Sequence, residues 1–178
     1  LMVVAKSEKA YSALKQAFHD REVNKIYHAV VQGHPDPLAG TIDAPIGRHP
    51  RSDWKFAVTN DGKHAVTHYT TLEAFPFASL LEIKLETGRT HQIRVHMKYL
   101  GHPLFNDDTY GGDKIRYMAS MAGYKSFIDN AFKICPRQAL HAYSLGFVHP
   151  TTNEFIHFEQ EFPEDFLTLL TKLRAIHG

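Results

Sequence analysis

The sequence predicts an α+β domain with a mixed, mainly antiparallel sheet and flanking helices. Several short segments alternate apolar with polar residues, a pattern typical of half-buried strands. Turns rich in glycine, proline and asparagine separate most of them, so neighbouring strands are expected to pair as hairpins. Fewer segments repeat apolar residues at helical spacing. With 178 residues, of which 43% are hydrophobic, the chain can bury a sizeable core.

The chain opens with an apolar run at residues 1–5, which predicts a buried strand. Ser7 then predicts the start of a helix, because a serine hydroxyl can accept a hydrogen bond from the backbone of the first turn. This helix carries Tyr11, Leu14 and Phe18 on one stripe, which is expected to face the core.

Four further strands are expected before residue 90, at 25–31, 41–44, 65–75 and 77–86. Gly33 and the proline-rich turn behind it end the first of them. The last two flank Pro76 and are expected to form an antiparallel pair. Residues 48–61 predict a polar loop, closed by the turn signal at Asn60, Asp61 and Gly62.

A helix is expected shortly after Gly88, which ends the strand before it. Thr90 is the predicted N-cap, and Gly101 followed by Pro103 is the predicted end. The apolar positions of this helix are Ile93, Met97 and Leu100.

The remainder of the chain predicts a loop, two helices and a hairpin. The loop covers 106–112, and residues 120–132 have weak helical character. Residues 139–148 and 154–159 are expected to pair as a hairpin. Pro163 opens the last helix, with acidic residues in its first turn and basic residues in its last. Its apolar face consists of Phe166, Leu169, Leu170 and Leu173.

The amino-acid composition excludes disulfide-rich and membrane-spanning proteins but does not by itself indicate a function. Twenty basic and nineteen acidic residues give a net charge of +1, which does not by itself indicate a nucleic-acid binder. The single cysteine, Cys135, excludes an internal disulfide framework and a cysteine-based zinc site, so a reduced cytoplasmic protein is expected. Apolar runs are all much shorter than the roughly 20 residues of a membrane span, so no membrane association is expected.

Two longer stretches carry most of the functional information. Residues 85–104 contain the string GRTHQIRVH, which runs from the turn after a predicted strand into the following predicted helix. Residues 25–33 read KIYHAVVQG. Both resemble signature motifs of the RluA-type family of RNA pseudouridine synthases, and they occur in the family's order. The resemblance extends from Leu1 to the final helix.

This resemblance implies a pseudouridine synthase-like fold and the isomerisation of specific uridines in RNA. Tyr27 matches the tyrosine that stacks on the target base and transfers a proton, and a phenol is chemically able to do both. Arg94 matches the arginine that pairs with the catalytic aspartate, keeping it ionised and oriented. No cofactor is expected, because the reaction is a redox-neutral rearrangement. The resemblance implies ribosomal or transfer RNA as the substrate, without saying which, and a monomer is expected.

The aspartate itself is not found in its family motif. Residues 1–7 match the strand that follows the aspartate motif, which places the catalytic aspartate about six residues before Leu1. Residues 1–178 are therefore expected to be the C-terminal major part of a single catalytic domain, inactive alone. Arg94 would then lack its partner, a costly arrangement unless another carboxylate or an anion takes that place.

Several basic and aromatic residues are candidates for RNA contact. Residues 48–56 interleave the two types, as RNA-binding surfaces often do. Arg89 lies at a helix start, where a phosphate is favoured, and Lys98 is a further candidate. The complete set of candidates is Arg48, Arg51, Trp54, Lys55, Arg89 and Lys98. An ordinary solvated surface explains the same residues, and the sequence leaves both readings open.

Other chemistries receive less support. His91 and His96 are five residues apart, not the four that places two ligands on one helical face, so no metal site is expected. Asp107 and Asp108 are assigned a turn or structural role, although a hydrolase using one of them is a third alternative. His141 is expected to be a hydrogen-bonded framework residue. The main alternative is a non-catalytic RNA-binding module derived from the same fold.

Overall fold

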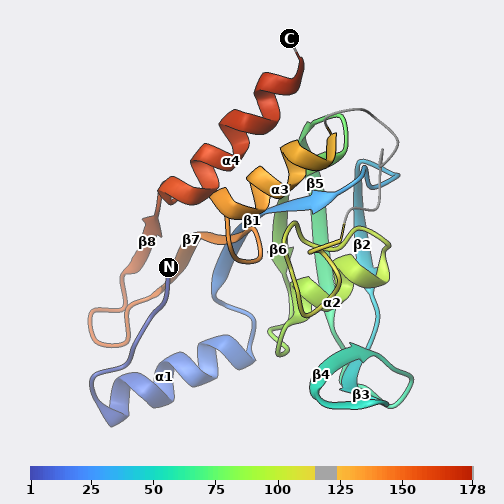
Figure 1. Ribbon diagram of the computed structural model, residues 1–178. Coiled ribbons are helices and arrows are strands. Elements are labelled where there is room, and N and C mark those ends of the chain that lie inside the picture. Colours follow the sequence, from blue (N-terminus) through green and yellow to red (C-terminus); the bar gives the residue numbers. More distant parts are fainter. Residues whose placement is uncertain (115–123, 178) are drawn as a thin grey trace.

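A six-stranded antiparallel sheet forms the centre of the molecule, in the order β2-β5-β6-β1-β7-β8 (Figure 1). The computed structural model describes residues 1–114 and 124–177. The strands of this sheet are β1 Asn24–Gln32, β2 Ala39–Asp43, β5 Val66–Ala74, β6 Ala78–Leu85, β7 Leu140–Val148 and β8 Phe155–Glu159. The predicted α+β class and the predicted strands from residue 25 onward are confirmed.

Within the described residues, four helices pack around the sheet. They are α1 Glu8–His19, α2 Gln92–Tyr99, α3 Tyr124–Ile134 and α4 Glu164–Arg174, the last followed by a 3-10 turn at Ala175–His177. In the part of the chain that the structure describes, no helix combines the length and the apolar character needed to cross a membrane.

The central strand β1 separates two cores, because successive side chains point to opposite faces. Val30 packs into the cluster that α3 and α4 cover. Ala29 and Val31 pack into the cluster on the other face, to which α2 contributes Ile93 and Met97. Tyr27 is two residues before Ala29 and packs against this second cluster. The fold therefore places Tyr27 on the face of the sheet that α2 covers.

The final helix, α4, covers the core that contains Val30, and it does so with the apolar face predicted from the sequence. Phe166, Leu169, Leu170 and Leu173 are all fully buried. Leu167, on the opposite side of the same helix, is 49% exposed. This contrast offers a matched pair of substitutions.

Leu170→Ala is expected to lower the free energy of unfolding by about 2–5 kcal/mol, because it removes buried apolar contacts and leaves a cavity. Leu167→Ala, a chemically identical change on an exposed face, is expected to stay within about 0.5 kcal/mol of the parent chain. Urea unfolding followed by circular dichroism measures both. Equal losses for the two variants would contradict the assigned packing of α4.

The N-terminal segment differs from the prediction. Residues 1–5 form no strand and are largely exposed, because both edges of the nearby β7 are already paired with β1 and β8. Ser7 caps α1 as predicted, accepting a hydrogen bond from the backbone of Ala10. On the predicted stripe, however, Leu14 is buried whereas Tyr11 and Phe18 are substantially exposed, since α1 packs only along the sheet margin.

The predicted polar loop at 48–61 is mostly a second, two-stranded sheet. β3 Ile46–His49 pairs with β4 Ser52–Val58, and the turn at 60–62 follows as predicted. The weak helix predicted at 120–132 corresponds to α3, and residues 120–123 of that prediction lie outside the described residues.

Candidate active site

Arg94 and Asp107 form a buried, two-pronged ion pair. The Arg94 Nε donates to Asp107 Oδ2 at 2.8 Å, and Nη2 donates to Oδ1 at 2.7 Å. The side chains are 12% and 0% exposed. Hydrogen bonding to this carboxylate raises the pKa of the Arg94 guanidinium above its usual value. Arg94 therefore has a partner in this chain, since another carboxylate, that of Asp107, takes the place left open in the sequence analysis.

The predicted loop at 106–112 holds Asp107 in place. The Tyr110 amide donates to Asp107 Oδ1, and the Gly112 amide donates to the Asp107 carbonyl. Gly112 lies so close to the Leu104 carbonyl that a Cβ atom would overlap it, which explains the glycine. Since both carboxylate oxygens accept hydrogen bonds and the group is buried, Asp107 has a structural role and is a poor candidate for a hydrolytic nucleophile.

Tyr27 lines a small pocket of about 190 Å³ together with Lys25 and the first three residues of the chain. Its ring is half-buried, and burial raises the pKa of its hydroxyl. The hydroxyl is therefore protonated at neutral pH. Ala142 lies opposite Tyr27 on β7, and the Ala142 carbonyl accepts a hydrogen bond from the Leu1 ammonium group. The start of the chain thus lies beside Tyr27.

Gln92 organises the turn between β6 and α2. Its Oε1 accepts hydrogen bonds from the Arg89 amide at 2.9 Å and from the Thr87 hydroxyl at 2.7 Å. The helix begins at Gln92 after His91, which has a φ of 55° and caps no amide with its side chain. The prediction that Thr90 caps this helix is wrong, because the Gln92 side chain ties down the turn in its place. The predicted end is confirmed, with Gly101 at a φ of +93°.

His96 fastens α2 to the sheet in a neutral form. Its Nε2 donates to the Ala44 carbonyl at 2.9 Å, and its Nδ1 accepts from the Thr67 hydroxyl at 2.8 Å. The Thr67 hydroxyl in turn accepts from Gln92 Nε2. Burial lowers the pKa of His96 and of the buried His28 below 6.5.

These two histidines predict acid sensitivity. Below pH 6.5 the unfolded chain binds protons that the folded chain does not, so the free energy of unfolding is expected to fall as the pH drops from 6.5 towards the lower folded-state pKa values. Urea unfolding at about pH 7.5 and pH 5.5 measures the loss. His96→Gln should reduce this pH dependence. An unchanged pH dependence in the His96 variant would refute the assignment.

The β3–β4 hairpin carries most of the predicted RNA contacts. The Arg48 guanidinium lies over the Phe56 ring at 4.7 Å, and Lys55 Nζ lies over the Trp54 ring at 4.6 Å. Trp54 is 61% exposed, and Arg51 is exposed at the turn between the strands. The hairpin therefore presents Arg48, Arg51 and Trp54 to solvent, whereas Phe56 is partly buried and packs against the core cluster that contains Tyr110.

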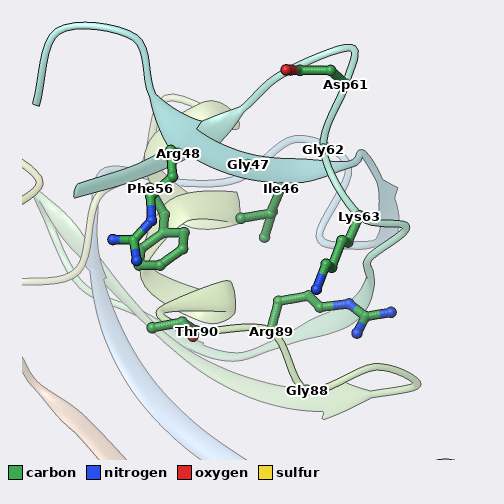
Figure 2. Close-up of a pocket in the computed structure, with 10 residues that line it drawn as sticks. All are labelled: Ile46, Gly47, Arg48, Phe56, Asp61, Gly62, Lys63, Gly88, Arg89 and Thr90. Atoms are coloured by element: carbon green, nitrogen blue, oxygen red, sulfur yellow. The ribbon is translucent and has the colours of Figure 1, made fainter. Parts of the chain in front are cut away.

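A pocket of about 490 Å³ lies between this hairpin and the start of α2 (Figure 2). Arg48 and Arg89, far apart in the sequence, both line it. Lys63 lines it as well, a residue that the sequence analysis did not single out. Lys98 lies elsewhere on α2, with its Nζ 5.8 Å from the centre of the Tyr110 ring. The predicted RNA-contact residues therefore fall into three places. Arg48 and Arg89 line the pocket, Arg51, Trp54 and Lys55 lie on the rest of the hairpin, and Lys98 lies apart from both on α2.

Within residues 1–114 and 124–177, no group of three or more histidine, cysteine and carboxylate side chains could hold a metal ion. His141 is a buried framework residue, whose Nε2 lies 2.8 Å from the Gln160 carbonyl.

Comparison with known proteins agrees with this geometry. The family model described as RNA pseudouridylate synthase matches residues 1–99. An uncharacterized RNA pseudouridine synthase of Mycobacterium bovis is 52% identical over 98% of this chain and 53% of its own length. The ribosomal large subunit pseudouridine synthase D of Pseudomonas aeruginosa is 46% identical over 98% of this chain and 53% of its own length. The chain thus spans about half the length of these relatives.

Solved structures show the same fold. The human RNA pseudouridylate synthase domain containing 1 superimposes with a TM-score of 0.69 and 29% identity, covering 90% of this chain and 63% of the other. Since the family model matches more than half of the chain and includes both Tyr27 and Arg94, this chain belongs to the RluA-type family of RNA pseudouridylate synthases.

Proposed function

We propose that this chain is the major part of the catalytic domain of an enzyme that isomerises specific uridines in RNA to pseudouridine. The reaction breaks the bond between the ribose and nitrogen 1 of the base and forms a new one to carbon 5. The proton on carbon 5 leaves, and nitrogen 1 gains one, so no oxidant or reductant is consumed. Reaching a paired uridine requires flipping it out of its stack.

The observation that carries this proposal is the position of Tyr27. It lies on the face of the sheet that α2 covers, in a pocket formed with the first residues of the chain. A segment preceding Leu1 would enter the molecule beside Tyr27, because the Leu1 nitrogen lies 3.2 Å from the carbonyl of Ala142, the residue opposite Tyr27 on β7. We therefore place the catalytic aspartate in that segment, and we call the chain with its preceding residues the extended protein.

Arg94 is suited to hold this aspartate. Asp107 occupies its Nε and Nη2, and in the described part of the chain Nη1 donates no hydrogen bond. A guanidinium has five N–H donors, so a second carboxylate can be bound at the free edge. Asp107 then acts as a support that fixes the direction of Arg94, while Arg94 orients the nucleophile.

The proposed substrate is large-subunit ribosomal RNA, because several relatives at 43% to 46% identity are named ribosomal large subunit pseudouridine synthase D. Contacts to this RNA are proposed for Arg48, Arg51, Trp54, Lys55, Arg89 and Lys98. Charged groups would bind phosphates, and exposed rings would stack on unpaired bases.

The test is to incubate the extended protein separately with unmodified large-subunit ribosomal RNA and with unmodified transfer RNA, and to map pseudouridines by carbodiimide modification and reverse transcription. New sites confined to the ribosomal RNA are expected. Sites confined to transfer RNA would overturn the proposed substrate. Binding without any new site would favour the non-catalytic RNA-binding module.

A further inference from the structure

The pocket between the β3–β4 hairpin and the start of α2 gathers three cationic side chains (Figure 2). Arg48 lies with Phe56 along one side of the pocket, and Lys63 and Arg89 lie together on the other. The volume of about 490 Å³ is within the range of small-ligand sites, roughly 300–1,000 Å³.

None of the three charges is neutralised by a neighbour. Among residues 1–114 and 124–177, every ion pair involves other cations. Arg48 donates through Nη1 to the Asp53 carbonyl, and Arg89 donates through Nε to the His64 carbonyl. These carbonyls fix the direction of each guanidinium but leave its other N–H groups available.

The surroundings strengthen the positive potential. Helix α2 begins at Gln92, two residues after Thr90 of the pocket wall, and has no acidic residue of its own in its first turn, so the positive end of its dipole adds to the potential near the pocket. Asp61 also lines the pocket, but in Figure 2 its carboxylate lies on the other side of the β3 ribbon from Lys63 and Arg89. Like charges that line one pocket repel one another, which is unfavourable unless an anion enters.

The walls are held in place before any ligand binds. The Tyr110 hydroxyl accepts a hydrogen bond from the Phe56 amide at 3.2 Å and lies 2.8 Å from His91 Nδ1, joining the hairpin to the start of α2. Ile46 and Lys63 exchange two backbone hydrogen bonds of 2.9 Å each. A preformed site loses less conformational entropy on binding.

We propose that this pocket binds one backbone phosphate of the RNA, with Lys63 and Arg89 contacting the phosphate oxygens and Arg48 closing the opposite side. A guanidinium offers N–H donors that suit the oxygens of a phosphodiester, and the ammonium group adds a second positive charge on the same side. That the phosphate comes from RNA rests on the proposed function. Lys63 is accordingly a specific binding residue, distinct from the lysines elsewhere on the surface.

The first experiment titrates inorganic phosphate and, separately, uridine into the isotope-labelled 178-residue chain and follows amide shifts by NMR. Phosphate is expected to shift the amides of Gly88, Thr90 and Lys63, and uridine is not. Lys63→Gln should abolish the phosphate response. The absence of phosphate shifts at these amides, or equal shifts with uridine, would overturn the proposal.

The second experiment measures the affinity of the same chain for a single-stranded RNA ten-mer as a function of salt. Lys63→Gln should reduce the slope of log K against log salt by about 0.7, the value for one lost phosphate contact on a single strand. Lys172→Gln on α4, which Figure 1 shows far from the hairpin, should leave the slope unchanged. Equal slopes for the two variants would overturn RNA as the source of the phosphate, even if inorganic phosphate binds.

These experiments distinguish failure of the proposed isomerase activity from failure of the proposed phosphate site. If the extended protein forms no pseudouridine but Lys63→Gln still reduces the slope, the proposed function fails and the phosphate site stands. If pseudouridine forms normally and Lys63→Gln behaves like Lys172→Gln, the phosphate site fails and the proposed function stands.

Discussion

Arg94→Lys in the extended protein is expected to reduce turnover about 100-fold, the scale of loss that follows a misplacement of reacting groups by about 1 Å. Lysine keeps the charge but cannot hold two carboxylates in a fixed plane. In the wild-type chain, hydrogen bonds of 2.8 Å from Nε and 2.7 Å from Nη2 to the Asp107 carboxylate hold the Arg94 guanidinium in one plane. The orientation of its remaining N–H groups is therefore fixed. Affinity for RNA should change far less, because Arg94 is only 12% exposed. Single-turnover kinetics at saturating enzyme measure the chemical step.

A matched control is available on the surface. Arg174 donates to both carboxylate oxygens of Glu73, but the two side chains are 47% and 34% exposed. Arg174→Lys should leave turnover unchanged and alter the free energy of unfolding by about 1 kcal/mol or less. If Arg94→Lys instead weakens RNA binding with a shallower salt dependence and near-normal chemistry, Arg94 contacts phosphate and is not part of the catalytic machinery.

Tyr27→Phe in the extended protein is expected to reduce the rate of the chemical step by about 10²–10⁴-fold, the usual contribution of a positioned proton-transfer group. The ring remains and only the hydroxyl is lost, so RNA affinity should be retained. Tyr27→Ala should weaken binding as well, by about 1–3 kcal/mol for one stacked base.

Tyr143→Phe serves as the control for this pair. Tyr143 is also a half-buried tyrosine, on the adjacent strand β7, but it stacks on His28 and its hydroxyl donates to Glu159. This substitution should leave the chemical step unchanged. Full activity in Tyr27→Phe would show that the Tyr27 hydroxyl is dispensable and that the ring mainly packs.

Most of the sheet could be predicted because its signals are local. The strands from β5 onward alternate in sequence and end at glycine, proline or asparagine turns, so each carries its own pattern. Residues 46–58 do not, because Pro50 and several charged residues interrupt the alternation, and their strand character depends on pairing with each other. Residues 1–5 are the opposite case. Their apolar run predicts a strand, but they form none, because the nearby β7 is already paired with a strand on each side.

The family motifs predict residues of the candidate site, but they do not predict which other residues those side chains contact. The motifs identify Tyr27 and Arg94, yet the pairing of Arg94 with Asp107 joins residues that are 13 positions apart through a loop without local signals. Lys63 was missed for the same reason. The turn at residues 60–62, directly before Lys63, was predicted from the sequence. That Lys63 and Arg89 line the same pocket, however, depends on how the hairpin packs against the start of α2 through the Tyr110 hydroxyl. Long-range contacts of this kind leave no periodicity in the sequence.

The most direct test of the central claim is tritium release from RNA that carries tritium at carbon 5 of its uridines. Forming pseudouridine must expel that tritium, so release counts completed isomerisations. The extended protein is expected to release tritium in proportion to its target uridines. The 178-residue chain alone is expected to release none if, as we propose, the nucleophile lies in the preceding segment. Release by the 178-residue chain alone would contradict the assignment of the nucleophile, and no release by the extended protein would contradict the proposed activity.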